Sequence, residues 1–276
     1  MINLINKAIN IKSFLKEARK IRSLKLKKIK PNHNLNKKLT VSITAKSERF
    51  LFLDLTLKSI FNQSIHPDEI ILWIENGDRK KIPNKISELK KYGLKIFFCK
   101  NFKSYNKIIH TLKIRKNNYI ITFDDDIIYN KKSIEFLIKK SKNYKKDIIA
   151  NRIHKIILNN KNFPIEYKKW KWNSSQKIKN KLNFQTGVYG VLYPPKCFYK
   201  DVLKVKIFKK LSPYADDIWL YWMIRLNNRF VVWSGFNKKN IEVINFDKKN
   251  LRKLNISKNF NDLQIKKLID YYGFPY

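Results

Sequence analysis

The sequence predicts an α/β fold with a mostly parallel sheet flanked by helices on both faces. From Leu39 onward, short apolar runs alternate with longer amphipathic stretches, as in β-α-β proteins. The chain has 276 residues, enough for one α/β domain with a terminal extension. Hydrophobic residues make up 43% of it, too many for a disordered chain despite 30% charged residues.

The expected elements follow one another without an internal repeat. Strands are expected at the short, mainly apolar segments 41–44, 69–74, 94–99 and 119–123. Helices are expected where apolar residues recur at helical spacing, at 50–63, 83–92, 104–115 and 132–144. In open parallel sheets ligands bind beyond the carboxyl ends of the strands. Functional residues are therefore expected at 44–49, 75–78, 101–107 and 124–126.

Residues 1–38 differ from the rest and are expected to form an extension and linker. Apolar residues recur near helical spacing up to Leu24, separated by basic residues and a single acid, Glu17. This pattern predicts a basic amphipathic helix that either lies on an anionic membrane surface or packs on the domain with its basic face in solvent. We slightly favour membrane contact. Pro31 and the Asn-rich residues 32–36 predict a linker, which leaves 39–276 as the main domain.

The net charge of +40 is a weak guide to function. The 61 Lys and Arg residues are spread along the whole chain, and Lys, Asn and Ile all have A/T-rich codons. A clustered basic patch would indicate nucleic acid, so no specific nucleic-acid partner is expected. The charge would still favour anionic substrates such as a nucleotide sugar.

Cysteines and hydropathy predict a cytoplasmic protein. Cys99 and Cys197 stand alone, without the spacing of a disulfide framework or a zinc site. No apolar run approaches the ~18 residues of a membrane span, and no secretory signal is recognisable. A peripheral position on the inner face of the cell membrane would follow if the basic helix binds it.

The strongest local signal is the acid triplet Asp124–Asp126, which follows the apolar run 119–123. Placing three carboxylates at the end of a buried strand is costly unless a positive group compensates. A hard divalent cation completed by substrate phosphates is the natural partner. On an extended backbone Asp124 and Asp126 would point the same way, and Asp125 elsewhere. The alternative is a solvated acidic turn or the start of a helix.

Several segments resemble family-2-like bacterial glycosyltransferases of the GT-A fold, particularly a subgroup from surface-polysaccharide and lipooligosaccharide loci. The resemblance covers about residues 39–230 and rests on the order and spacing of these pieces: Thr56–Ser64, Pro67–Trp73, Thr122–Tyr129, Ala150–His154, Thr186–Pro195 and Ala215–Trp219. It implies an inverting enzyme that moves a sugar from a nucleotide-sugar donor, with a UDP-sugar favoured, to a glycan or lipid-linked glycan. Residues 39–130 would be its nucleotide-binding half and 131–276 its acceptor half.

The resemblance also implies roles for individual donor-site residues. Asp124 and Asp126 occupy the D-x-D positions that contact the ribose and Mn²⁺ or Mg²⁺, and Asp125 belongs to the same donor site. The base would lie near Thr44 to Glu48 and Glu75, although many relatives have Asp at the last position. Lys107 could reach a phosphate, or could have only a structural role, since lysines are abundant throughout the chain.

On the acceptor side, the resemblance points to the pair Asp216 and Asp217. Asp217 is expected to be the general base, with Asp216 as an acceptor or structural contact; both could instead cap the helix that follows. Gly187 and Gly190 would border the donor sugar, with an ordinary β-bulge as the alternative. His154 is a candidate third metal ligand, although a structural histidine is the favoured interpretation.

Two other classes of function compete. A non-enzymatic nucleic-acid- or membrane-binding protein would explain the charge but not the acid triplet. A nucleotidyltransferase of similar fold is the closest enzymatic alternative, but no Gly-rich phosphate loop follows the first strand.

Overall fold

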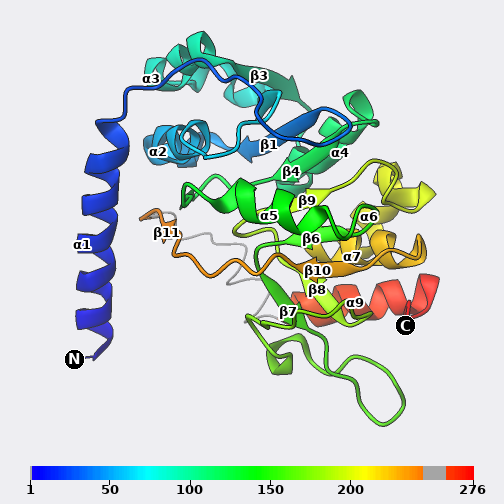
Figure 1. Cartoon of the computed structure of the whole chain (residues 1–276). Coiled ribbons are helices and arrows are strands. Elements are labelled where there is room, and N and C mark those ends of the chain that lie inside the picture. Colours follow the sequence, from blue (N-terminus) through cyan, green and yellow to red (C-terminus); the bar gives the residue numbers. More distant parts are fainter. Residues whose placement is uncertain (1, 245–258) are drawn as a thin grey trace.

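A computed structural model of the chain describes residues 2–244 and 259–276, with side chains from residue 11 onward. A seven-stranded sheet forms its centre, in the order β10-β6-β9-β4-β1-β2-β3 (Figure 1). Its strands are β1 Leu39–Ala45, β2 Glu69–Glu75, β3 Leu94–Cys99, β4 Tyr119–Thr122, β6 Ile148–Ala150, β9 Val191–Tyr193 and β10 Val231–Trp233.

Most neighbouring strands are parallel, as the sequence predicts. The pairs β1–β2, β2–β3, β1–β4 and β6–β10 are parallel, whereas β9 runs antiparallel to both β4 and β6. Because β1 lies between β2 and β4, their carboxyl ends meet at one edge of the sheet, where a ligand site is expected. Two short ladders lie outside this sheet: β5 Ile127–Ile128 with β11 Ile241–Glu242, and β7 Ile153–Lys155 with β8 Asn183–Gln185.

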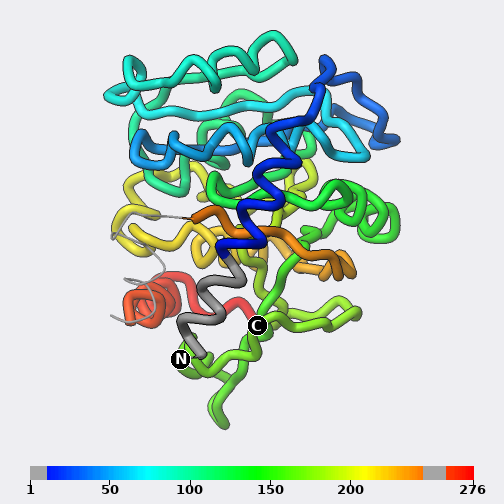
Figure 2. Tube along the Cα trace, turned by 90° about the vertical axis from the view of Figure 1, so that its left-hand side faces the viewer, coloured from blue at the N-terminus to red at the C-terminus, as the bar shows by residue number. Residues whose placement is uncertain are grey.

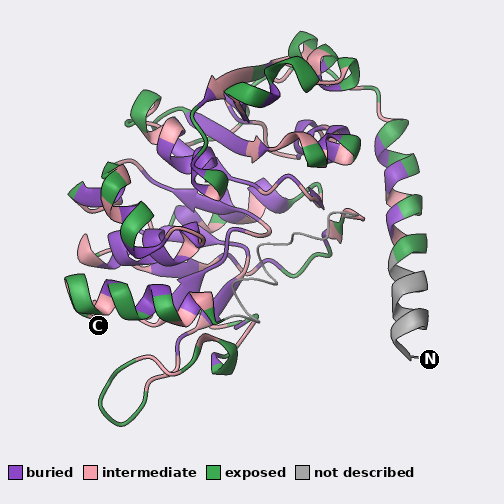
Figure 3. Cartoon of the chain, turned by 180° about the vertical axis from the view of Figure 1, so that it is seen from behind, coloured by how far each residue is buried: buried purple, intermediate pink, exposed green. Residues whose placement is uncertain are grey.

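Helices cover both faces of the sheet. The α-helices of the described residues are α1 Ile2–Arg22, α2 Phe50–Phe61, α3 Asn84–Ser87, α4 Asn106–Ile114, α5 Ser133–Ser141, α6 Val205–Leu211, α7 Asp216–Leu226 and α9 Phe260–Tyr272. One face packs against α4, α6, α7 and α9, and the other against α2, α3 and α5. Alternate strand residues separate accordingly: Ile120 belongs to the first core and Ile121 to the second. The central strands are correspondingly buried in Figure 3, whereas the edge strand β3 is mostly of intermediate burial.

The expected strands and helices before residue 145 are present, with one change of type. The helix expected at 83–92 is only a single α-helical turn, α3, followed by a 3₁₀ segment over residues 88–92. Gly93, with φ of 111°, ends it in the left-handed conformation that glycine favours. Further 3₁₀ turns occur at 47–49, 76–81, 103–105, 167–169 and 200–203.

The N-terminal extension is packed on the domain rather than detached from it. Helix α1 runs along the edge formed by α2 and β11 (Figures 1 and 2). The expected linker is also anchored, because the Asn32 amide donates to the Ser64 carbonyl and accepts from the backbone N–H of His66. His33 Nε2 lies 2.8 Å from Asp68 Oδ2. None of the helices in the part of the chain that the structure describes is long and apolar enough to cross a membrane.

Candidate active site

The acid triplet forms a turn at the carboxyl end of β4. The strand ends at Thr122, and Asp125 and Asp126 lie in the turn before β5. The hydroxyl of Tyr129 accepts the backbone N–H of Asp124 at 2.8 Å and donates to its carbonyl at 3.2 Å. Asp124 and Asp126 are expected to point the same way on an extended backbone. That expectation does not apply here, because the backbone forms a turn at Asp125 and Asp126.

Lys107 on α4 joins the triplet to the second acidic pair. Its Nζ lies 2.6 Å from Asp124 Oδ1 and 3.4 Å from Asp216 Oδ2. Only 6% of the Lys107 side chain is exposed. Burial opposes the charge, but Asp124, Asp216 and Asp217 together raise the pKa of Lys107 well above its usual range. Lys107 is thus a buried, permanently charged link between the triplet and α7, and not a surface lysine.

Arg49 compensates the other two acids of the triplet. Its Nη1 lies 2.6 Å from Asp125 Oδ1 and 2.9 Å from Asp126 Oδ2. Burial raises the pKa of Asp125 in spite of this contact. Arg49 falls within the expected functional range 44–49, but nothing in the sequence distinguished it from the 61 basic residues.

Arg49 does not keep the pKa of Asp126 at the usual value of an aspartate. Burial and the neighbouring Asp125 and Asp124 raise the pKa of Asp126 to about 7. About a third of its side chain, 34%, remains exposed. Because Asp126 is partly accessible and has several negatively charged neighbours, an additional cation bound there would be stabilised.

The second acidic pair lies at the start of α7, where the sequence placed it. The Gly187 N–H donates to Asp217 Oδ2 at 2.9 Å, and the Gln185 amide donates to the Asp217 carbonyl at 2.9 Å. Burial and the adjacent Asp216 raise the pKa of Asp217 to about 8. Asp216 is more buried and pairs with Lys107. The two acids thus have different surroundings.

Gly187 and Gly190 have different physical reasons to be glycine. A Cβ on Gly187 would lie 3.1 Å from both Asp217 Oδ1 and Lys107 Nζ, and 3.6 Å from Asp124 Oδ1. A Cβ on Gly190, which has φ of 101°, would lie 2.4 Å from the ring of Phe123. Gly187 therefore keeps room where the two acidic groups meet, and Gly190 lets the loop pack beside the strand exit.

The residues expected to hold the base lie at the neighbouring strand ends. Thr44 Oγ1 donates to the Trp73 carbonyl at 3.1 Å, and Glu75 Oε2 accepts from the Asn101 amide at 2.6 Å. Glu48 lies in the exposed 3₁₀ turn after β1. These side chains border the edge of the sheet from which the acid triplet emerges, because β1 pairs with both β2 and β4.

His154 is not gathered with the acids. Its ring stacks on Trp172 with centroids 5.0 Å apart, and its Nδ1 accepts the Asn173 N–H at 3.2 Å. In the described part of the chain, no group of three His, Cys, Asp or Glu side chains is arranged to hold a metal. A metal at the triplet would therefore need Asp124 and Asp126 together with ligands from substrate and water.

The triplet nevertheless suits such an ion chemically. Carboxylate oxygens are the ligands that Mg²⁺ and Mn²⁺ prefer, and Mg²⁺ is commonly bound by one or two carboxylates plus substrate phosphates. Burial, and then the charges of Asp125 and Asp124, raise the pKa of Asp126, and the charge of Arg49 only partly offsets them.

A C-terminal segment that the sequence did not flag supports this turn. Strand β11 pairs with β5 directly after the triplet, and the Val243 N–H donates to the Asp126 carbonyl at 2.8 Å. Glu242 on β11 adds to the negative charge that raises the pKa of Asp126. Two apolar residues at 127–128 are too short a run to predict a strand partner so distant in sequence.

Residues 40–203 match the sequence model of glycosyl transferase family 2. The chain belongs to glycosyl transferase family 2. This membership makes it a glycosyltransferase enzyme and agrees with the GT-A resemblance of its segments. It therefore supports glycosyl transfer over the two alternatives, a non-enzymatic binding protein and a nucleotidyltransferase.

Solved structures of other proteins share the fold. The S. aureus protein TarS (residues 1–349) superposes with a TM-score of 0.51 at 13% identity, over 84% of this chain and 66% of that one, slightly under two thirds of its length. The mannosyltransferase PcManGT from Pyrobaculum calidifontis, in complex with GDP-Man and Mn²⁺, superposes with a TM-score of 0.51 at 11% identity, over 98% of this chain and 81% of that one. No curated protein has a significantly similar sequence.

Proposed function

We propose that this family 2 enzyme transfers a sugar from a nucleotide-sugar donor to a surface-glycan acceptor, with inversion at the anomeric carbon. The observation that carries the proposal is the gathering of Asp124, Lys107, Gly187 and Asp217 at one edge of the sheet. A cationic group and two acidic groups of different surroundings therefore lie within contact distance of one another.

The donor would lie along the edge formed by β1, β2 and β4. Thr44, Glu48 and Glu75 would contact the base and ribose, so that residues 39–130 form the nucleotide-binding half. Asp124 and Asp126 would hold Mn²⁺ or Mg²⁺, which when bound supplies Lewis-acid stabilisation of the diphosphate. Lys107 would place a second positive charge beside the same leaving group. The Mn²⁺ and GDP-Man bound to PcManGT are consistent with this chemistry.

Asp217 would act as the general base from the acceptor half, residues 131–276. An acceptor hydroxyl that attacks the anomeric carbon must lose its proton, and a carboxylate with a pKa of about 8 is well matched to accept it. Its Oδ2 is held by the Gly187 N–H, which fixes the direction of the carboxylate. Asp216, paired with Lys107, would maintain the position of α7 or contact the acceptor. One base and a leaving group on the opposite face give inversion.

The proposal also names the class of acceptor and of donor. The resemblance to surface-polysaccharide and lipooligosaccharide enzymes supports a glycan or lipid-linked glycan, which would be met on the cytoplasmic face of the membrane. A UDP-sugar is the favoured donor.

The first test is thermal stability with sugar nucleotides of UDP, GDP, CDP and TDP, each with and without Mn²⁺. A ligand that binds only the native protein at a hundredfold excess over its Kd stabilises it by about 2.7 kcal/mol. We expect one nucleotide class to raise Tm in the presence of Mn²⁺. D126N should lose the Mn²⁺-dependent part of that shift, whereas D270N, an exposed acid on α9, should keep it. An equal Mn²⁺-dependent shift in D126N would refute the metal role of Asp126.

The second test separates binding from transfer. D217N should retain the donor-induced shift in Tm but release nucleoside diphosphate at least about 100-fold more slowly in the presence of acceptor, as is typical for loss of a general base. A wild-type rate in D217N would exclude Asp217 as the base and leave the donor site unaffected.

A further inference from the structure

One face of α1 is already occupied by the domain. Phe14, Ala18 and Ile21, spaced three and four residues apart, are each only 2% exposed. They pack with Leu55 of α2 and Ile128 of β5. This face anchors the helix and is unavailable to any partner.

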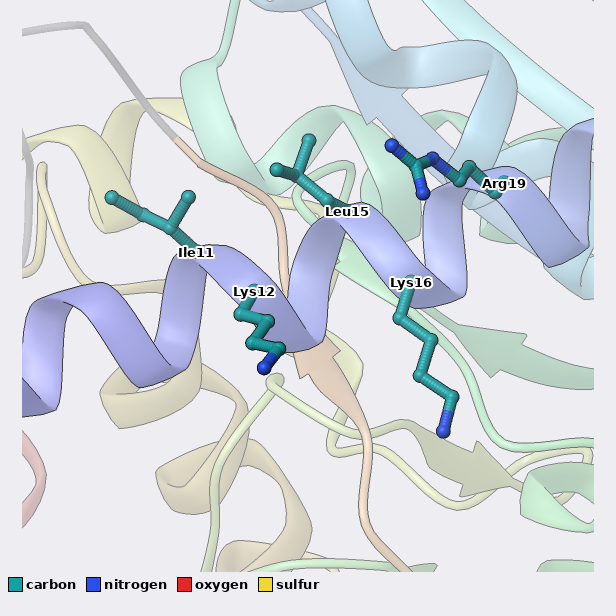
Figure 4. Close-up of a pocket in the computed structure, with 5 residues that line it drawn as sticks. All are labelled: Ile11, Lys12, Leu15, Lys16 and Arg19. Carbon is teal, nitrogen blue, oxygen red and sulfur yellow. The ribbon is translucent and has the colours of Figure 1, made fainter.

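Away from this face, the described part of α1 carries aliphatic and cationic side chains at the surface. Ile11 and Leu15 are 38% and 48% exposed, and they line a shallow surface pocket with Lys12, Lys16 and Arg19. Figure 4 shows Ile11, Leu15 and Arg19 in a row along one side of the helix, with Lys12 and Lys16 projecting from the adjacent side. We call these five residues the Ile11 face. The acid nearest to them in the sequence, Glu17, is paired with Lys20.

We propose that the Ile11 face binds the surface of an anionic lipid bilayer. The aliphatic pair would enter the boundary between headgroups and acyl chains, while the lysines and Arg19 would contact lipid phosphates. Charge complementarity selects an anionic partner. The exposed aliphatic pair favours a bilayer over nucleic acid, because nucleic-acid phosphates offer nothing to cover it.

This orientation has a consequence for the active site. Helix α1 contacts β11, and β11 pairs with β5 immediately after the acid triplet. A bilayer under α1 would therefore lie on the side of the molecule where the triplet emerges (Figures 1 and 2). This step rests on the proposed function, since it places the donor site near a lipid-linked acceptor; binding of the bilayer itself does not depend on it.

Sedimentation of the full chain with lipid vesicles tests the proposal. Vesicles of phosphatidylcholine are compared with vesicles that also contain phosphatidylglycerol. Each Lys or Arg near an anionic surface contributes about fivefold to partitioning. We expect K12E/K16E to bind the anionic vesicles at least about tenfold more weakly than the wild type. I11S/L15S should also bind more weakly, by about tenfold, although it retains every charge.

Matched controls separate this face from the general positive charge. K145E/K146E changes two exposed lysines just before β6, and I178S changes an aliphatic residue that is 72% exposed. Both should bind the anionic vesicles within about twofold of the wild type, because they leave the Ile11 face intact.

Three results would overturn the proposal. They are an equal loss in K145E/K146E, unchanged binding in I11S/L15S, and wild-type protein that binds RNA but not the anionic vesicles. The donor-induced shift in Tm should be the same in all variants. Its absence from every protein would count against the proposed function and leave the vesicle result interpretable.

Discussion

Replacing Lys107 with methionine removes a buried ammonium and retains an unbranched apolar side chain. The ammonium lies 2.6 Å from Asp124 and 3.4 Å from Asp216, and its charge lowers the pKa of Asp217 against burial. Breaking a buried ion pair by removing one partner costs about 3–5 kcal/mol. Because 27% of the Asp124 side chain is exposed, solvent can screen part of the uncompensated charge. We therefore expect a loss near the lower end, about 3 kcal/mol.

Lys139 provides a control, because it forms an ion pair of the same length as that of Lys107 but at the exposed surface. Its Nζ also lies 2.6 Å from a carboxylate, that of Glu135, but the Lys139 side chain is 70% exposed. An exposed pair at this helical spacing contributes about 0.5 kcal/mol or less. In chains of this size 1 kcal/mol corresponds to about 2–4 °C in Tm. K107M should therefore melt roughly 6–12 °C below the wild type and K139M within about 2 °C of it.

The loss in K107M should also depend on pH. The folded pKa of Asp217, about 8, already exceeds the value near 4 of an unfolded Asp, and removal of Lys107 raises it further. Between about pH 4 and pH 8 both native proteins hold a proton that the unfolded state releases, so wild type and K107M lose stability in parallel. Above about pH 8 wild-type Asp217 is ionised, and only K107M continues to lose stability as the pH rises. Urea unfolding at about pH 7 and about pH 9.5 should therefore give a larger difference between K107M and wild type at the higher pH. An equal difference at both pH values, or a loss no larger than that of K139M, would refute the electrostatic explanation.

Three further predictions address catalysis, the glycine loop and the N-terminal helix. If Asp217 is the base, kcat/KM should rise roughly tenfold per pH unit up to about pH 8, and in D217N the residual rate should lose this dependence; a flat wild-type profile would argue against the assignment. G190A should lower the free energy of unfolding by about 2 kcal/mol or more in urea titrations, because Gly190 has a positive φ and its new Cβ would clash with the Phe123 ring. G235A is the control, because Gly235 also has a positive φ but has open space around it, and it should lose less stability. Equal losses in the two variants would contradict the clash. F14A should lower the free energy of unfolding by about 3 kcal/mol, because Phe14 is buried where α1 packs on the domain. L15A removes the exposed neighbouring side chain and should change Tm little. A negligible effect of F14A would mean that α1 does not contribute to stability.

The sequence predicts the elements between residues 39 and 130 well because each has a strong local pattern. Strands such as Glu69–Glu75 are continuous apolar runs, and α2 repeats its apolar residues at helical spacing. The spacing predicts a helix over 83–92, but the segment is mostly 3₁₀, because hydrophobic spacing does not distinguish the two kinds of helix over so short a length. The pairing of β5 with β11 joins residues far apart in sequence, and no local pattern indicates it.

For the site, residue patterns alone indicate the acids but not the groups that compensate them. Asp124–Asp126 and Asp216–Asp217 stand out because acids are scarce, with 21 in the chain. Lys107 is singled out only through the family resemblance, and Arg49 not at all among 61 basic residues, although their placement makes the acid cluster tolerable. The Tyr129 hydroxyl holds the turn through the backbone of Asp124, a contact that depends on a turn geometry not predictable from residue type.

The link between Val243 and the Asp126 carbonyl has a consequence for biosynthesis. The acid turn is supported by β11, a strand that the ribosome makes long after the turn itself. While the chain is still emerging, the triplet exists without this support. In a growing polypeptide the acid turn therefore gains this support only after β11 has left the exit tunnel.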